Sequence, residues 1–143
     1  MISHRPFFAF HHTNAFEKDG RLILDIVTYQ DAQIIAQVNE GHFPAKLERF
    51  SLSLKDGEIA SEILFSDSNE FPRINEKFDG HPYRYAYVAG FNGKEGLHKG
   101  LHKIDTETKK ALYWNESDCS AGEPIFVASP DAKEEDDEVV LCL

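Results

Sequence analysis

Residues 19–29 read Asp-Gly-Arg-Leu-Ile-Leu-Asp-Ile-Val-Thr-Tyr, and this stretch decides the fold class. The run that begins at Arg21 is rich in β-branched and other apolar residues, a composition that favours strands. An Asp-Gly pair between two such runs is typical of a β-hairpin turn, because glycine adopts the positive φ that tight hairpin turns need. The stretch therefore predicts that residues 21–29 pair with the aromatic-rich residues 7–16 that precede them.

The same pattern recurs along the rest of the chain. A second Asp-Gly pair, at residues 56–57, separates the strand-like residues 47–54 from residues 58–65. Further strand-like runs are residues 83–89, 101–104, 111–114, 124–128 and 138–143. Short, evenly spaced strands predict an all-β protein. Because the first and last runs stand at the two ends of the sequence, with unpaired edges, part of a propeller or barrel is favoured over a closed domain.

Two stretches depart from the strand pattern. Residues 31–40 carry apolar side chains at helical spacing and predict the only helix. Residues 131–138 contain six acidic residues and one lysine, which predicts a solvated loop.

The composition excludes several classes of protein. Fifteen Lys and Arg against 25 Asp and Glu give a net charge of −10, so we expect no nucleic-acid partner, because phosphates need a basic patch. No apolar run approaches the roughly 20 residues that span a bilayer. The first residues lack the layout of a secretory signal, and Cys119 and Cys142 stand far apart. These features predict a cytoplasmic protein with two free thiols rather than one disulfide.

The histidines are the first candidates for chemistry. There are seven: His4, His11, His12, His42, His81, His98 and His102. His11 and His12 are neighbours in a predicted strand, so their side chains point to opposite faces and only one of them can reach a given site. From the residues alone, a structural role is the commoner interpretation for a lone strand histidine, and a metal role is the alternative.

Two glutamates are the second candidates. Glu70 and Glu123 are each followed within two residues by proline and apolar residues, which predicts that each begins a buried strand. A buried carboxylate is costly unless something pairs with it. The partner is either Arg73 or a backbone N–H, or else the ring N–H of a metal-bound histidine, and the residues alone leave these alternatives open. The aromatic residues before Tyr29 suit an ordinary core, and they equally suit a tunnel for a long apolar substrate.

Three motifs in order resemble the carotenoid cleavage oxygenase family, which includes apocarotenoid and β-carotene oxygenases, lignostilbene dioxygenases and the retinal pigment epithelium isomerase. Residues 10–17 (FHHTNAFE) resemble its F-H-x-x-N-A-aromatic-E strand. Residues 70–75 (EFPRIN) with residues 83–87 (YRYAY) resemble the next block. Residues 122–127 (GEPIFV) and 134–141 (EEDDEVVL) resemble the last, although Glu138 replaces the family's usual glycine, which we expect to be a loop change without consequence.

The resemblance implies a seven-bladed β-propeller with a non-haem Fe(II) held by four histidines, three of which are backed by glutamates. By position, His11 resembles an iron ligand, and Glu70 and Glu123 resemble glutamates that accept hydrogen bonds from ligand histidines. The other three ligands have no counterpart in this sequence. We therefore expect residues 1–143 to be a C-terminal-half fragment of two to three blades, with no second domain.

The implied reaction adds O2 across a conjugated C=C bond of a carotenoid, apocarotenoid or stilbenoid and releases two carbonyl products. The implied partners are an apolar polyene or stilbenoid and O2, with peripheral membrane contact through parts outside this chain. The isolated fragment is expected to be inactive, because a metal site needs its full ligand set. The alternatives are a non-catalytic propeller fragment with a structural or interaction role and, among enzymes, an isomerase.

Overall fold

Antiparallel strands dominate the computed structural model, which describes residues 4–37, 44–91 and 100–142. The first sheet has the order β1-β2-β3-β4 and consists of β1 (His12–Lys18), β2 (Arg21–Thr28), β3 (Lys46–Ser53) and β4 (Ile59–Phe65). The second sheet has the order β5-β6-β7-β8 and consists of β5 (Asn69–Arg73), β6 (Tyr85–Gly90), β7 (Gly100–Asp105) and β8 (Lys110–Trp114). The terminal hairpin pairs β9 (Ile125–Ala128) with β10 (Glu138–Leu141). Two four-stranded meanders and a hairpin are the expected two to three blades of a propeller.

The predicted hairpin turns form for the predicted reason. Asp19 and Gly20 have φ values of 51° and 73°, and the residues that flank them, Lys18 and Arg21, pair across the ladder. Two central residues with positive φ are what a two-residue hairpin turn requires. Gly57, with φ of 77°, serves the turn between β3 and β4. Two of the further strand-like runs pair as the hairpin of β7 with β8, and the last two pair as the hairpin of β9 with β10.

Two expectations need correction. The aromatic residues 7–10 do not extend β1, and Phe8 alone pairs with Tyr29 through an isolated bridge. The predicted helix at residues 31–40 shrinks to α1 (Ile34–Gln37), while residues 38–40 lie outside the described part of the chain. The short helix buries Ile34 in the core, whereas its neighbour Ile35 is exposed.

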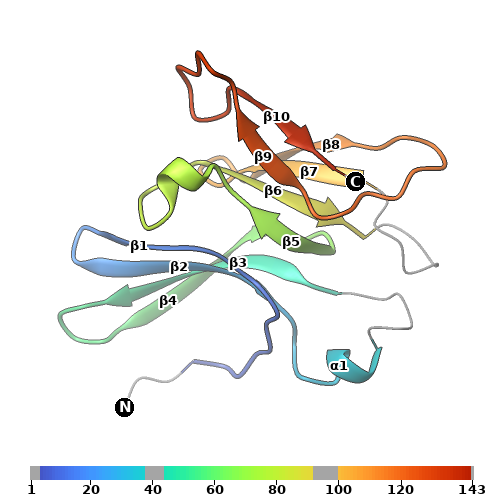
Figure 1. Cartoon of the computed structure of the whole chain (residues 1–143). Helices are drawn as coiled ribbons and strands as arrows, with labels where there is room; N and C mark the ends of the chain where they lie inside the picture. Colours follow the sequence, from blue (N-terminus) through green and yellow to red (C-terminus); the bar gives the residue numbers. More distant parts are fainter. Residues whose placement is uncertain (1–3, 38–43, 92–99, 143) are drawn as a thin grey trace.

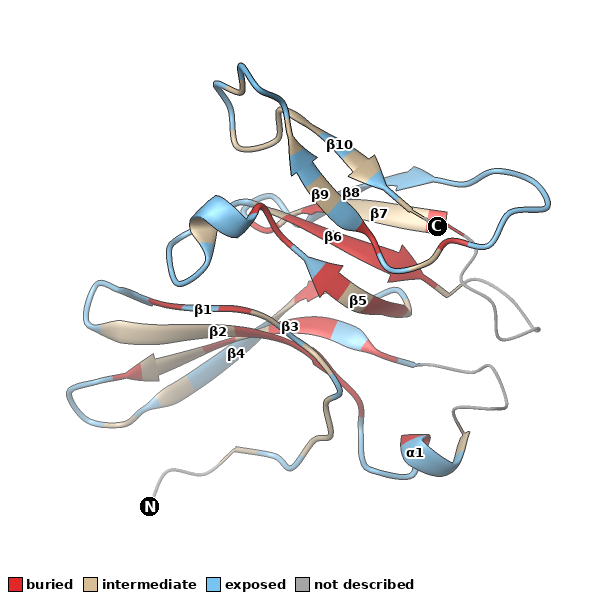
Figure 2. Ribbon diagram, viewed as in Figure 1, coloured by how far each residue is buried: buried red, intermediate tan, exposed pale blue. Residues whose placement is uncertain are grey.

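The core lies where the two sheets meet. Figure 1 shows β5 as the strand of the second sheet nearest to the first sheet. In Figure 2 the buried residues concentrate on β2, β3, β5 and β6, whereas β8 is exposed along its length. One hydrophobic cluster joins both sheets: Phe16, Val27, Tyr29, Ile34, Ala45, Leu47, Leu64, Ile74, Tyr83, Ala86, Val88 and Ile104. The edge strands β1 and β5 are therefore held side by side by a shared core.

Asn14 fastens β1 to the loop that follows β5. Its side-chain amide donates to the carbonyl oxygens of Phe78 (3.1 Å) and His81 (3.0 Å). Its side-chain oxygen accepts from the backbone N–H of Gly80 (3.1 Å). Phe78 closes a 3-10 helix, η2 (Glu76–Phe78), so the buried asparagine uses its hydrogen bonds to fix the start of β1 against the second sheet.

The acidic stretch is a loop, as expected, but part of it is anchored rather than solvated. The Glu135 carboxylate accepts hydrogen bonds from the backbone N–H groups of Arg84 (2.8 Å) and Tyr85 (2.7 Å). The backbone carbonyl of Glu135 accepts a hydrogen bond from the Asn75 side chain (3.1 Å). These contacts tie the terminal hairpin to the start of β6. Among the described residues, no helix is long and apolar enough to cross a membrane.

Candidate metal-ligand site

His11 and Glu70 meet at the junction of the two sheets. His11 directly precedes β1, Glu70 is the second residue of β5, and the Nδ1 atom of His11 lies 2.7 Å from Oε2 of Glu70. A carboxylate can only accept a hydrogen bond, so Nδ1 carries a proton, and in the neutral imidazole Nε2 then keeps its lone pair. The His11 side chain is 40% exposed and that of Glu70 is 4% exposed. The ring is thus held from its buried side and presents Nε2 on its other side.

Three donors satisfy the Glu70 carboxylate. Besides His11, the backbone N–H of Phe71 donates to Oε2 (3.1 Å), and the Tyr29 hydroxyl donates to Oε1. A buried charge is tolerated when it is paired and hydrogen-bonded in this way. Burial and the neighbouring carboxylate raise the pKa of Tyr29, so its hydroxyl remains protonated and available as a donor. Tyr29 is a site residue that the sequence patterns did not identify, because nothing local links it to Glu70.

A β-bulge in β5 directly follows Glu70, the residue whose side chain contacts His11. Glu70 pairs with Ala89 and Arg73 pairs with Tyr87, so β5 has one more residue than β6 between these pairs. Phe71 takes the extra position with φ of 53°, which is an outlier for a bulky side chain and more so before a proline. Pro72 has no N–H to offer the ladder, so a bulge is where it can be accommodated. Strained bulges of this kind are over-represented at functional sites.

Glu123 behaves differently from Glu70. Its side chain is 44% exposed and forms an ion pair with Arg73, which is itself half exposed. The expectation that Glu123 begins a buried strand is therefore wrong: Pro124 is buried, and β9 begins at Ile125. Arg73 was one of the three partners that the sequence left open, and in the described part of the chain Glu123 pairs with Arg73 rather than with a histidine. Of the two glutamates, Glu70 is the one that serves His11.

The remaining described histidines have other surroundings. His4 Nδ1 contacts the Arg5 carbonyl (3.0 Å), His12 is exposed on β1, and His81 Nδ1 contacts the Asp79 carbonyl (2.8 Å). His102 lies between the Phe65 and Tyr113 rings, with centroids 4.8 and 4.6 Å away. His42 and His98 lie outside the described residues. Within residues 4–37, 44–91 and 100–142 no group of three or more His, Cys, Asp or Glu side chains could hold a metal ion. Among these described residues, the His11 imidazole is the candidate metal ligand, because its Nδ1 is hydrogen-bonded to Glu70 and its Nε2 lies on the other side of the ring.

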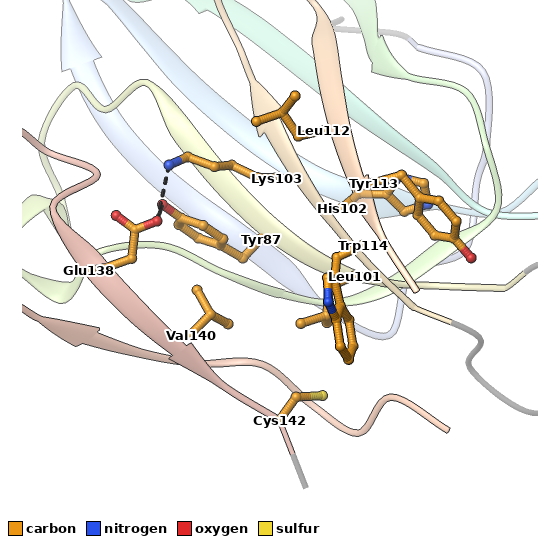
Figure 3. A pocket seen from close by; sticks show the side chains of 10 residues that line it. All are labelled: Tyr87, Leu101, His102, Lys103, Leu112, Tyr113, Trp114, Glu138, Val140 and Cys142. Carbon is orange, nitrogen blue, oxygen red and sulfur yellow. Dashed lines mark hydrogen bonds and ion pairs between the residues drawn. The ribbon is translucent and has the colours of Figure 1, made fainter. Parts of the chain in front are cut away.

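A pocket of about 400 Å³ lies elsewhere, between the second sheet and the terminal hairpin (Figure 3). Its lining residues are Tyr87, Leu101, His102, Lys103, Leu112, Tyr113, Trp114, Glu138, Val140 and Cys142. Figure 3 shows Glu138, Lys103 and Tyr87 meeting on one side, with Trp114 and Leu101 on the other. Glu138 accepts from the Tyr87 hydroxyl (2.7 Å) and from Lys103 Nζ (3.0 Å). Glu138 is therefore not a loop change without consequence, because its 8% exposed side chain joins the hairpin to the sheet.

Comparison with protein families and curated proteins identifies relatives along the whole chain. The profile of the family described as retinal pigment epithelial membrane protein matches residues 1–143. The β,β-carotene 15,15′-dioxygenase of Mus musculus is 33% identical over 95% of this chain and 31% of its own length. The apocarotenoid-15,15′-oxygenase of Synechocystis is 34% identical over 95% of this chain and 30% of its own length. The chain thus spans about three tenths of the length of these relatives.

Solved structures give the same relationship. A chimera of the Synechocystis-type oxygenase and the retinal pigment epithelial protein superimposes with a TM-score of 0.83 at 33% identity, over 94% of this chain and 30% of the chimera. A cobalt-substituted Synechocystis apocarotenoid oxygenase superimposes with a TM-score of 0.83 at 30% identity, over 94% of this chain and 30% of that oxygenase. The cobalt substitution marks that relative as a metalloprotein. The observed meanders therefore correspond to the sheets of known propeller oxygenases.

Proposed function

This chain belongs to the carotenoid oxygenase family, and from that premise we propose that it forms part of a non-haem Fe(II) dioxygenase that cleaves a conjugated C=C bond of a carotenoid, apocarotenoid or stilbenoid. The observation that carries the proposal is the His11–Glu70 pair. A ligand histidine usually donates its second ring N–H to a carboxylate, which fixes the tautomer and the ring orientation. His11 and Glu70 have this arrangement, with Nδ1 engaged and Nε2 free.

The donor chemistry is compatible with iron. Neutral imidazole nitrogen is a ligand for Fe(II), among other divalent metals. In this proposal His11 supplies one ligand through Nε2, and three further histidines come from sequence outside residues 1–143. Bound iron would supply the activation of O2. The residues of this chain hold and orient one ligand, and Glu70 keeps its Nδ1 proton in place.

Aromatic side chains beside His11 suit an apolar substrate. The Phe71 ring meets the His11 ring edge to face at 5.2 Å, and the Phe10 ring lies 6.5 Å away and is 41% exposed. Apolar rings next to a metal ligand exclude water and favour a hydrocarbon partner. A polyene or stilbenoid with O2 as co-substrate is consistent with the carotenoid and apocarotenoid substrates that name the relatives.

The test is the metal content of the longest form of the protein that can be purified with this segment in it. His11→Ala is expected to lose bound iron and polyene cleavage together, because a ligand is missing. His12→Ala is the matched control, since the exposed neighbour points to the other face of β1 and should keep the iron. Retention of iron by His11→Ala, or its loss in His12→Ala alone, would refute the assignment. A protein that never binds iron would support the non-catalytic alternative.

A further inference from the structure

A buried tyrosine hydroxyl lies behind the His11–Glu70 pair. Tyr29 directly follows β2 in the first sheet, and its hydroxyl donates to Oε1 of Glu70 on β5 in the second sheet. We propose that Tyr29 is a positioning residue: through Glu70 it fixes the ring of His11 in the tautomer that leaves Nε2 free for a ligand. The link to metal binding rests on the proposed function, whereas the effect on the ring does not.

The geometry leaves the carboxylate one orientation. Oε1 is engaged by Tyr29 and Oε2 by the backbone N–H of Phe71, so each oxygen has a donor before His11 is considered. Rotation of the carboxylate about its terminal bond would separate both oxygens from these donors in a site where Glu70 is 3% exposed. An unpaired oxygen at such a place is costly. Oε2 therefore stays directed at Nδ1 of His11.

Tyr29 is itself immobilised. Its residue is 2% exposed, and its backbone exchanges two hydrogen bonds with Phe8, at 2.8 and 3.1 Å. The Phe10 ring meets the phenol ring edge to face at 5.6 Å. A donor fixed at both backbone and ring can hold its acceptor in place, which a mobile surface hydroxyl cannot do. Tyr29, held in place by the first sheet, thus fixes the position of the Glu70 carboxylate on the second sheet.

The competing explanation is that Tyr29 fills space in the core and its hydroxyl merely finds an acceptor. The chain provides a matched control, because Tyr83 is also buried and also donates to a buried carboxylate, that of Asp25 (2.5 Å). Tyr83→Phe and Tyr29→Phe remove the same atom from similar surroundings. A purely structural hydroxyl would affect both variants in the same way, whereas a positioning role moves the His11 ring in Tyr29→Phe alone.

The experiment reads the His11 ring by ¹⁵N NMR of the protein in its metal-free form, at a pH at which the imidazole is neutral. The wild type is expected to show the Nδ1–H tautomer. In Tyr29→Phe the ratio of Nδ1–H to Nε2–H is expected to fall by about tenfold, in line with the loss of one hydrogen bond to a charged acceptor. Tyr83→Phe should leave the ratio unchanged. An unchanged ratio in Tyr29→Phe, or an equal fall in both variants, overturns the proposal.

Two further results test the proposal if Tyr29→Phe does not fold or if the proposed iron site is wrong. If Tyr29→Phe does not fold, the wild-type spectrum decides: His11 in the Nε2–H tautomer, or a Tyr29 hydroxyl proton in fast exchange with water, contradicts the positioning role. If the tautomer shifts as expected while His11→Ala retains iron, then the positioning role stands and the proposed function fails. If instead the tautomer ratio does not change in Tyr29→Phe while His11→Ala loses iron, the proposed function stands and Tyr29 has no positioning role in it.

Discussion

Asp25 and Arg49 lie opposite each other on β2 and β3 and form a two-pronged ion pair, with Nε and a terminal nitrogen of Arg49 at 2.8 and 2.7 Å from the two carboxylate oxygens. Asp25 is completely buried, and it also accepts the Tyr83 hydroxyl at 2.5 Å. Tyr83 leads into β6, so the carboxylate joins the first sheet to the second. The pair therefore belongs to a polar link between the two sheets at whose junction His11 and Glu70 meet.

Removal of Arg49 should be costly, because it leaves a buried charge without its partner. We expect Arg49→Met to lower the free energy of unfolding by about 3–5 kcal/mol. Lys109→Met is the control: it breaks an ion pair with Glu62 in which both side chains are about half exposed, and it should cost less than about 1 kcal/mol. Urea unfolding measures both. Equal losses in the two variants would show that the Asp25–Arg49 pair is no more important than a surface contact.

If the protein binds iron as proposed, substitutions at Glu70 and Glu123 should differ in their effect on metal affinity. Glu70→Gln is expected to weaken metal affinity or activity by roughly 10–100-fold, because the amide cannot accept from three donors as the carboxylate does. Glu123→Gln should have no such effect, since its carboxylate is exposed and paired with Arg73. Metal titration of both variants tests this difference, and a larger effect at Glu123 would reverse the assignment.

Asn14→Ala should destabilise the junction between β1 and the loop after β5. The variant leaves the Gly80 N–H and the carbonyls of Phe78 and His81 without the partner they have now. Loss of buried hydrogen bonds of this kind costs about 1–3 kcal/mol, which thermal unfolding can measure. His12→Ala, on the same strand but exposed, should change the stability little. If Asn14→Ala were as stable as His12→Ala, the Asn14 hydrogen bonds would not stabilise the junction between β1 and the loop after β5.

His102 should make the fold sensitive to mild acid. Burial lowers the pKa of His102 below its ordinary value of 6.5, with Asp67 opposing the shift in part. The unfolded chain therefore takes up a proton at a higher pH than the folded chain, so the contribution to stability is full above pH 6.5 and is lost as the pH falls below it. Unfolding free energies at pH 7.5 and 5.5 should differ less in His102→Gln than in the wild type. His12→Gln should keep the wild-type difference.

Local chemistry explains why the hairpins could be predicted and the site only in part. Asp19 and Gly20 dictate their turn within two residues, and the alternation of apolar side chains does the rest. The prediction that Glu123 is buried was wrong because it rested on local sequence: a proline and apolar residues follow Glu123, as they follow Glu70. The exposure of Glu123 depends instead on how the terminal hairpin packs on the second sheet. The contribution of Tyr29 could not be predicted, since its hydroxyl meets Glu70 only through the packing of two sheets.

The positions of the site residues along the chain set an order of events during synthesis. Tyr29 and His11 precede their common partner Glu70 by 41 and 59 residues, whereas each hairpin closes over a few residues. Short loops close in well under a microsecond to microseconds, and distant contacts wait for the intervening chain. A ribosome-bound chain that has reached only β4 contains the residues of the first sheet, yet its His11 ring does not have the Glu70 carboxylate as a partner. The hydrogen bond between His11 and Glu70 therefore forms late, after β5 has been synthesised.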